Sequence, residues 1–360
     1  MNNHTVNKSS ETVISKCAVV KIGIDVHAKF VVATRQLDGS NPQPPQKFAP
    51  GDFEQWAQKQ LQIGQKVVTC YEAGPTGFWL HRRLTDLGST NLVVCPTCLD
   101  SRKKGVNTDQ TDSKELGSRL DRYLAGNEKA MSVVTVPTLA QEQRRAMTRQ
   151  REQLRRHRLS LAAQGRTLML LHGFRRSNLW WKKASWDKLL VELPAWLIPR
   201  LEIFRDLIHR VEEKVALLTK EITQSAPKVR PFGLGPLTYE IIDREVGDWK
   251  RFKNWRQVGS YAGLTGGVSG SGEKQADLSI TKAGNARLRR VLIEAAWRLV
   301  LCQPDYWLVK KWRQVLLNPK AHVRRRKQVI VAFARQLFVD LWKWKTGKAT
   351  PQSLGWSMMA

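Results

Sequence analysis

Short apolar runs rich in β-branched residues predict strands in the first third of the chain. Residues 19–24 read Val-Val-Lys-Ile-Gly-Ile and lead directly to Asp25. A second β-rich run follows at 30–35, and the sequence Leu-Asp-Gly-Ser at 37–40 has the composition of a turn. The chain is therefore expected to open with a β-hairpin that carries Asp25 near its turn.

A third strand is predicted at 67–71, where Val-Val-Thr-Cys-Tyr leads to Glu72. The sequence Gly-Pro-Thr-Gly at 74–77 ends this strand, and a helix is expected to begin near Phe78. A further core strand is expected at 92–95. Two strand ends thus carry an acidic residue.

Beyond Pro137 the pattern becomes that of helices. One set of apolar residues recurs every seven positions, with mostly polar companions: Ala140, Met147, Leu154, Leu161 and Leu168. A second set alternates steps of four and three, the a/d pattern of a coiled coil: Leu197, Leu201, Phe204, Ile208, Val211, Val215, Leu218 and Ile222. The second helix can pair with the preceding helix or with another protomer, and the sequence leaves both possibilities open.

The last third contains two candidate phosphate-binding segments. A Gly-Leu-Gly turn at 233–235 feeds a predicted helix at 239–246, and N–H groups at a helix N-terminus attract phosphate, although a tight helical turn explains the same sequence. Residues 281–290 begin another helix with cations on one flank. The hydroxyl-rich stretch 266–274 between them is expected to be a flexible loop.

These changes of pattern predict five segments. They are a disordered N-terminus at 1–18, an α/β domain at 19–137, a helical coiled-coil spacer at 138–226, a mainly α-helical domain at 227–348 and a tail at 349–360.

Charge limits the possible partners. The 360 residues include 60 Lys and Arg against 31 Asp and Glu, a formal net charge of +29, so the chain attracts polyanions. The 42% of hydrophobic residues are ample for packed cores. No apolar run reaches the ~18 residues of a membrane span, and residues 1–16 lack the apolar core of a signal peptide. A cytoplasmic protein without a membrane partner is expected.

The five cysteines are scattered and odd in number, which favours free thiols over a disulfide framework. Cys95 and Cys98 are spaced like two zinc ligands, but Cys17, Cys70 and Cys302 supply no second pair. Zinc or redox chemistry is therefore not expected.

Four acidic residues have the spacing of a phosphodiester-cleaving centre: Asp25, Glu72, Asp109 and Asp112. The first two end strands, and the last two lie three residues apart, on one face of a helical turn. Carboxylates are suitable ligands for Mg²⁺ or Mn²⁺, and two such ions roughly 3.5–4 Å apart stabilise the attacking and leaving oxygens of a phosphoryl displacement. Each acid alone is usually an N-cap or a solvated charge, but their order along strand, strand and helix is the layout of RNase H-like folds.

Several motifs make nearly the whole chain resemble one family. They are Gly23-Ile24-Asp25-Val26-His27, Tyr71-Glu72-Ala73-Gly74-Pro75-Thr76-Gly77-Phe78-Trp79-Leu80, Thr108-Asp109-Gln110-Thr111-Asp112, Ser260-Tyr261-Ala262-Gly263-Leu264-Thr265, Ser271-Gly272 and Ile280-Thr281-Lys282-Ala283-Gly284-Asn285. The chain resembles the DEDD transposases of the bacterial insertion-sequence 110/1111 group, whose first domain is similar to the RuvC resolvase. The family often has Lys and Ala where this chain has Asn107 and Ser113.

The resemblance implies a recombinase that moves its own insertion element. The four acids would hold Mg²⁺ or Mn²⁺ at the scissile phosphate, and the attacking serine would be Ser271, with Ser269 as the competitor. It further implies that a structured bridge RNA selects donor and target DNA, that the protein is a dimer or tetramer, and that it acts at the bacterial nucleoid. No histidine that would activate the serine is evident near it.

The residues expected to contact nucleic acid are basic or lie in phosphate-binding turns: Arg102, Lys103, Lys104, Gly233, Gly235, Lys282, Asn285, Arg287, Arg289 and Arg290. The arginine-rich stretch 144–158 is either a further nucleic-acid surface or a solvated helix face.

Two other functions fit the same residues. A junction resolvase or nuclease would use water, so Ser271→Ala would leave cleavage intact. A basic nucleic-acid-binding protein without catalysis would be unaffected by Asp25→Ala. A sugar kinase also begins with a Gly-x-Asp hairpin, but the second glycine-rich phosphate turn that it needs does not follow in this sequence.

Overall fold

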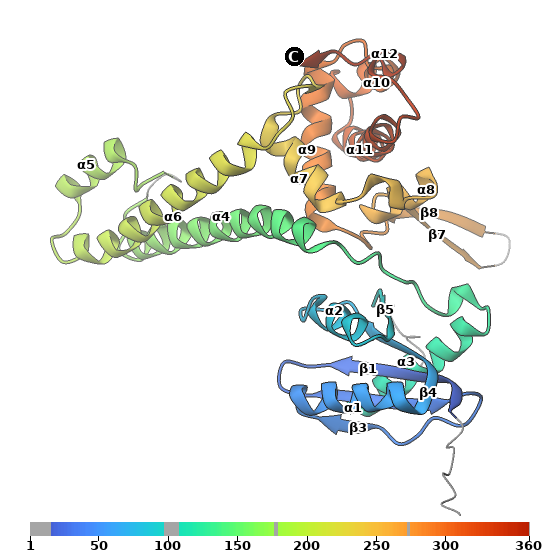
Figure 1. The fold of residues 1–360 in the computed structure, drawn as a ribbon. Helices are drawn as coiled ribbons and strands as arrows, with labels where there is room; N and C mark the ends of the chain where they lie inside the picture. The colour runs from blue at the N-terminus through green and yellow to red at the C-terminus, as the bar shows by residue number, and fades with distance from the viewer. Residues whose placement is uncertain (1–15, 97–107, 176–178, 272–273, 360) are drawn as a thin grey trace, which may run out of the picture. The chain divides into compact units, whose positions relative to one another are not determined.

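The computed structural model describes residues 16–96, 108–175, 179–271 and 274–359. The chain divides into two compact units, residues 1–136 and 137–360, which are described separately below (Figure 1). Among the described residues, no helix combines the length and the apolar character needed to cross a membrane.

A five-stranded sheet with the order β3-β2-β1-β4-β5 forms the centre of the first unit. β1 (Cys17–Val26) pairs antiparallel with β2 (Val31–Leu37), and β3 (Gln46–Phe48) extends that edge. On the other side, β4 (Gly64–Glu72) runs parallel to β1, and β5 (Thr90–Val94) runs parallel to β4. The predicted hairpin and strands are confirmed, and the sheet is mixed.

Helices cover both faces of this sheet. α1 (Pro50–Ile63) and α2 (Trp79–Asp86) pack on one face, in a core that includes Phe53 and Leu80 with alternate residues of β1 and β4. α3 (Asp109–Leu124) packs on the other face, where its leucines meet the remaining residues of β4. A short 3-10 helix, Glu128–Ala130, follows α3. The start of α2 confirms the helix predicted near Phe78.

The second unit begins with a pair of long helices. α4 (Leu139–Leu171) starts with a capping box at Thr138, and α6 (Ile198–Gln224) runs back along it, while the short helix α5 (Lys183–Glu192) lies between them in sequence (Figure 1). Hydrogen bonds from Arg151 to Thr219 and from Arg158 to Glu212 show that α4 and α6 are antiparallel.

The apolar seam of α6 is buried against α4 within the chain. Leu201 and Ile208 are fully buried in a core that also contains Met169 of α4 and Trp180. Trp180 packs directly on Gly165, where an added Cβ would lie 2.2 Å from its ring. The pairing with the preceding helix, one of two possibilities left open by the sequence, is the one that the structure shows.

The remaining elements of this unit form a mainly helical core around α9. They are β6 (Arg230–Pro231), α7 (Pro236–Val246), the 3-10 helix Trp249–Arg251, α8 (Trp255–Tyr261), β7 (Gly266–Ser271), β8 (Lys274–Ile280), α9 (Ala286–Cys302), α10 (Trp307–Leu316), α11 (Val323–Lys345), α12 (Pro351–Leu354) and β9 (Met358–Met359). α9 and α11 contribute many of the fully buried side chains. The helix predicted at 239–246 begins three residues earlier, at Pro236.

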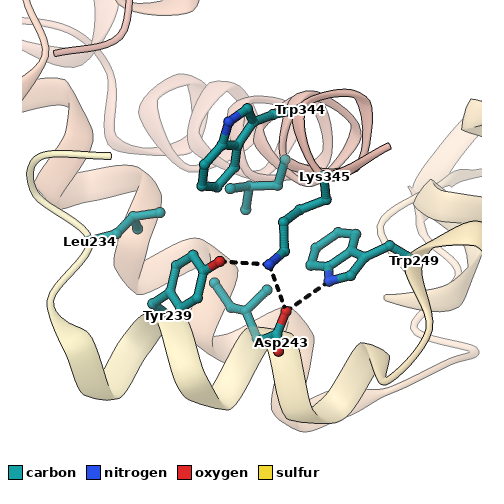
Figure 2. Close-up of a pocket in the computed structure, with 8 residues that line it drawn as sticks. Leu234, Tyr239, Asp243, Trp249, Trp344 and Lys345 are labelled. Carbon is teal, nitrogen blue, oxygen red and sulfur yellow. Dashed lines mark hydrogen bonds and ion pairs between the residues drawn. The ribbon is translucent and has the colours of Figure 1, made fainter. Parts of the chain in front are cut away.

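A small polar cluster joins α7 to α11 (Figure 2). Lys345 donates a hydrogen bond to Tyr239 Oη at 2.6 Å and pairs with Asp243 Oδ1 at 3.1 Å. Trp249 Nε1 donates to the same oxygen of Asp243 at 2.9 Å. The cavity beside this cluster has a volume of about 10 Å³, roughly enough for one water molecule. It is therefore a packing feature of the core and not a ligand site.

The expectation of a flexible loop at 266–274 is wrong for residues 266–271 and 274, and residues 272–273 lie outside the described part of the chain. Residues 266–271 form β7 and pair antiparallel with β8, with Ser269 opposite Ala276 and Ser271 opposite Lys274. The partner strand alternates polar residues with Ala276, Leu278 and Ile280, a two-residue period typical of strands. Ladder hydrogen bonds to this strand hold the glycine-rich segment in an extended conformation.

Candidate functional site

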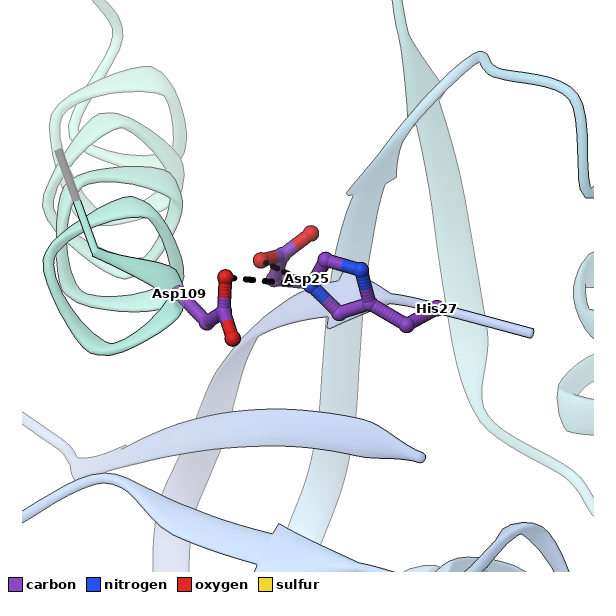
Figure 3. Close-up of side chains that lie close together, drawn as sticks. All are labelled: Asp25, His27 and Asp109. Carbon is purple, nitrogen blue, oxygen red and sulfur yellow. Dashed lines mark hydrogen bonds and ion pairs between the residues drawn. The ribbon is translucent and has the colours of Figure 1, made fainter. Parts of the chain in front are cut away.

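Two of the four predicted acids meet at one end of the sheet (Figure 3). Asp25 is the next-to-last residue of β1, and Asp109 is the first residue of α3. The Nε2 atom of His27 lies 2.9 Å from Oδ2 of Asp25 and 3.4 Å from Oδ1 of Asp109. Since ionised carboxylates only accept hydrogen bonds, Nε2 donates and links the two acids.

The donor atoms of this cluster are suited to a divalent cation. One possible ligand atom from each of Asp25, His27 and Asp109 lies within 4.8 Å of the others. Carboxylate oxygens suit Mg²⁺ and Mn²⁺, and imidazole nitrogen is common around transition metals. Asp109 has 47% of its side chain exposed, so the cluster is open to solvent. The residues present therefore fit a bound cation.

Glu72 and Asp112 lie within electrostatic reach of this cluster. Glu72 is the last residue of β4, and Asp112 lies in the first turn of α3. Burial raises the pKa of Glu72, and the negative charges of Asp112 and Asp25 raise it further, while Arg119 opposes them. The carboxylate of Glu72 thus lies in a crowded negative field, which a cation would relieve.

A glycine contact brings α3 close to β1. A Cβ built on Gly23 would lie 2.3 Å from backbone atoms of Ser113 and Gly117, so the helix backbone rests directly on the strand. Nearby, the hydroxyls of Thr34 and Ser113 share a hydrogen bond of 2.9 Å. Only glycine permits this approach, and the approach places the first turn of α3 beside the end of β1.

Sequence reasoning assigned no role to three residues of this site. His27 follows Asp25 by two residues, and the two-residue period of a strand would have placed both on one face. Glu115 and Arg119 follow Asp112 at helical spacing, and they pair with each other at 3.1 Å. Periodicity counted from the predicted acids would therefore have found all three.

The two serines lie in the β7–β8 hairpin of the second unit. Its base is fixed by backbone hydrogen bonds between the two downstream motifs, Thr281 to Thr265 at 2.9 Å and Asn285 to Tyr261 at 2.8 Å. Gly284 has φ +141°, and an added Cβ there would lie 2.7 Å from the backbone of the other motif. The motifs at 260–265 and 280–285 are thus one structural element that supports the hairpin.

Of the residues expected to contact nucleic acid, Arg102, Lys103 and Lys104 lie outside the described residues, as does Cys98. Gly235 precedes α7 as its N-cap, and Gly233 packs against Cys302 with φ +88°. Lys282 is exposed, with φ 57°. Their contacts with nucleic acid stay predictions.

Four others on or near α9 already have partners within the chain. The side chain of Asn285 caps α9 and donates to Glu245 at 2.7 Å. Arg289 donates to the carbonyl oxygens of Ala262 and Lys282. Arg287 and Arg290 pair with Glu152 of α4. Their contacts with nucleic acid likewise stay predictions.

The arginine-rich part of α4 is partly a structural contact. Arg149 donates two hydrogen bonds to Glu245, at 2.9 and 2.8 Å, and Arg144 pairs with Glu240 at 3.2 Å. Burial opposes ionisation of Glu245, yet the hydrogen bonds from Arg149 and Asn285 hold its pKa below the ordinary value. These cations therefore hold α4 against α7. The sequence had predicted either a nucleic-acid surface or a solvated helix face, and neither prediction included this structural role.

Comparisons with known proteins identify the class. Residues 231–311 match the family model described as "Transposase IS116/IS110/IS902 family". The chain is 31% identical to the "Putative transposase y4rJ" of Sinorhizobium fredii, over 77% of this chain and 76% of that protein. It is 26% identical to the "Probable family 20 transposase" of Pseudomonas aeruginosa, over 89% and 91% of the two chains. It is 25% identical to the transposase for insertion sequence element IS1111A of Coxiella burnetii, over 67% of each chain.

Taken with the strand-end acids and the basic helical unit, these relatives define the class as insertion-sequence transposases, which are DNA-processing enzymes. The chain belongs to the IS116/IS110/IS902 family of transposases, which confirms the predicted membership of the insertion-sequence 110/1111 group.

Proposed function

We propose that this transposase cuts and rejoins DNA with a divalent cation held by Asp25, Glu72, Asp109 and Asp112. The observation that carries the proposal is the meeting of Asp25 and Asp109 at His27, from elements far apart in the sequence. A purely structural acid would be expected to pair with Arg or Lys, as Glu245 does. Here Asp25 and Asp109 instead contact one imidazole, that of His27.

We further propose that the first unit has an RNase H-like, RuvC-like fold. Support comes from the sheet order β3-β2-β1-β4-β5, with three antiparallel strands followed by two parallel ones. The positions of the acids at the ends of β1 and β4 and at the start of α3 agree with that layout.

The proposed cation is Mg²⁺ or Mn²⁺. When bound, such a cation stabilises the negative charge that develops on the oxygens of a phosphodiester during displacement. The carboxylates would hold it, and the imidazole of His27 would position Asp25 by donating a hydrogen bond. The raised pKa of Glu72 agrees with a site whose negative charges are balanced only after a cation enters.

Ser271 is proposed as the nucleophile, with Ser269 as the alternative. Its hydroxyl oxygen would form a bond to phosphorus while the bond from phosphorus to the leaving deoxyribose oxygen breaks. The serine gives up its proton and the leaving oxygen takes one up, so a free hydroxyl and a phosphoserine link result. This link retains the energy of the broken bond, and attack by another strand's hydroxyl would rejoin the DNA.

The proposal includes a guide RNA and more than one protomer. The net charge of +29 supports binding of polyanions, and the resemblance to the family points to a structured RNA that selects donor and target. Two DNA strands must be exchanged, so a dimer or tetramer is proposed.

A covalent adduct assay tests the proposal. Purified protein is incubated with Mg²⁺, the flanking non-coding RNA and end-labelled donor DNA, then denatured and examined for DNA that remains attached to protein. The wild type and Ser269→Ala should form the adduct, and Ser271→Ala and Asp25→Asn should not. Omission of the RNA should abolish it as well.

The alternative is a nuclease that uses water, for which the carboxylate site alone would suffice. In that case Ser271→Ala would produce free nicked ends with the same yield as wild type, and Asp25→Asn would produce none. Equal activity of Asp25→Asn and wild type would instead contradict any catalytic role of the carboxylates.

A further inference from the structure

The second unit contains a pocket bordered by α4, α7 and α9, with a volume of about 290 Å³. We call it the arginine pocket, because five arginines line it: Arg151, Arg155, Arg287, Arg290 and Arg298. Three glutamates also line it, so the charges of the arginines must be compared with the acids available to them.

The acids of the pocket are already engaged. Glu152 accepts from Arg156 at 2.6 Å, Arg290 at 2.7 Å and Arg287 at 3.1 Å. Burial opposes its ionisation, but the hydrogen bonds from Arg290 and Arg156 outweigh burial and lower its pKa. Glu245 is held by Arg149. The third, Glu294, lies 3.9 Å from Arg290 and is 58% exposed. Each of the three carboxylates thus has a cationic partner, and other guanidiniums of the pocket have no acidic partner among the described residues.

Three arginines of the pocket lack an acidic partner within the part of the chain that the structure describes. Arg155 and Arg298 make no ion pair there, and Arg151 donates to the hydroxyl of Thr219 at 2.6 Å. Burial lowers the pKa of Arg151, and the positive charge of Arg155 lowers it further. Like charges have therefore been placed together at a cost to stability.

The start of α7 adds to the positive potential of the pocket. Leu237 and Thr238, in the first turn, line it, and no side chain caps the helix at Gly235. Gly235 lies beside Arg298, since a Cβ built on it would be 3.7 Å from Nη1 of that arginine. Partial positive charge at a helix N-terminus favours an anion, here next to unpaired guanidiniums.

We propose that the arginine pocket binds a phosphate group of a nucleic-acid strand. A planar guanidinium donates two parallel hydrogen bonds to phosphate oxygens, and Arg155 and Arg298 approach from different helices. A volume near the lower limit of ligand pockets suits one phosphate with its sugar. No base edge is read in such a contact, so the pocket would bind strands of any sequence. The identity of the ligand as a strand rests on the proposed function, but the anion site does not.

The first experiment measures strand binding by fluorescence anisotropy with the full-length protein and a labelled oligonucleotide. The variants are Arg155→Gln, Arg298→Gln and their combination. Lys214→Gln, on the exposed face of α6, is the control that removes one positive charge away from the pocket. Each pocket variant should raise Kd by about 5- to 10-fold and reduce the slope of log K against log salt by about 1.

The second experiment measures thermal unfolding in inorganic phosphate and in chloride at equal ionic strength. Phosphate should raise the Tm of wild type and of Lys214→Gln, but not that of the double variant. In chloride the double variant should unfold no earlier than wild type, because it removes repulsion and breaks no ion pair. This result would also show that any loss of strand binding does not come from misfolding.

The outcomes distinguish the pocket from the proposed function. Equal Kd values for the double variant and Lys214→Gln, with equal phosphate effects, would overturn the pocket. Loss of the phosphate effect with unchanged strand affinity would show that it takes a free phosphorylated compound, which overturns the strand as ligand. If no protein bound strands while phosphate still stabilised wild type and Lys214→Gln but not the double variant, the proposed function would fail and the anion site would remain.

Discussion

Glu72 in the first unit and Glu245 in the second show opposite effects of their surroundings. Glu245 is only 1% exposed, yet its pKa is lowered because Arg149 and Asn285 donate hydrogen bonds to it. Glu72 is less buried, yet its pKa is raised, because burial disfavours its charge, the surrounding acids add to this effect, and Arg119 compensates only in part. The partners of an acid, more than its depth, therefore distinguish a structural charge from a site that lacks its ligand.

A similar contrast holds for two basic residues at the arginine pocket. Arg149 has its pKa raised by the hydrogen bonds to Glu245, whereas Arg151 has its pKa lowered by burial and by Arg155. Both arginines lie on α4, two residues apart. Arg149 thus stabilises the packing of two helices, whereas Arg151, by our proposal, contributes to phosphate binding.

The largest expected effect is that of Asp25→Asn. This change should lower the rate of strand cleavage by at least about 10³-fold, roughly 4 kcal/mol of transition-state stabilisation, because it removes a ligand charge at the reacting phosphate. Glu128→Gln removes an exposed carboxylate of the same unit and should leave the rate unchanged. Cleavage of labelled DNA in Mg²⁺ compares the two. Equal cleavage rates for Asp25→Asn and Glu128→Gln would contradict a catalytic role of Asp25.

Glu245→Gln should instead act on stability. It leaves the half-buried Arg149 without its anion and removes the charged acceptor of the hydrogen bonds from Arg149 and Asn285, so we expect a loss of about 2–3 kcal/mol in the free energy of unfolding at about pH 7. The pKa of Glu245 is depressed below 4.5, so its contribution is complete above that pH and is lost as the pH falls through the native pKa. Urea unfolding should show that the difference in unfolding free energy between wild type and Glu245→Gln is smaller at about pH 3 than at about pH 7.

Glu213→Gln, at an exposed position of α6, is the control for this measurement. It should change the unfolding free energy by less than about 0.5 kcal/mol at either pH. A difference between wild type and Glu245→Gln that stays constant with pH would contradict the assignment of Glu245 as a charge held by cations.

A pair of glycine variants tests how the carboxylate site is positioned. Gly23→Ala should destabilise the first unit by about 2–3 kcal/mol, because its Cβ would meet the backbone of α3 at 2.3 Å. Gly117→Ala, on the other side of the same contact, would place its Cβ 3.8 Å from Gly23 and should be neutral or stabilising by up to about 1 kcal/mol. Denaturant unfolding of both variants checks this order.

The smallest expected effect is a gain in stability from Glu72→Gln. The change removes a charge that burial and neighbouring acids disfavour, so Tm without divalent cations should rise, on the order of 2 °C. Added Mg²⁺ should then stabilise wild type more than the variant. A lower Tm for Glu72→Gln under cation-free conditions would mean that Arg119 makes Glu72 a structural charge.

The sequence predicted the elements that carry the acids better than it predicted their partners. Strand periodicity located β1, β2, β4 and β5, and the first turn of α3 was expected at Asp109, because these signals depend on neighbours in sequence. The role of Gly23 was not predicted, since its contact is with a helix about 90 residues away. Pairing of Arg149 with Glu245 spans 96 residues and leaves no local signal either.

For the β7–β8 hairpin, the secondary structure itself was predicted incorrectly. Its glycines and serines are poor strand formers, so local composition favoured a loop, and the alternation at 274–280 was overlooked. The correct structure depends on pairing between the two segments. For the same reason the partner of α6 remained open, because an a/d pattern defines an apolar face without identifying what covers it.

Residues 356–359 close the core of the second unit. Strand β9 pairs with β6, the side chain of Gln303 bonds to both backbone groups of Ser357, and Trp356 packs against Tyr306. A stop codon even a few positions before codon 356 would therefore leave a hole in this core. Damaged copies of such a gene would yield unstable protein that the cell's proteases degrade, so late truncations should silence a copy as effectively as early ones.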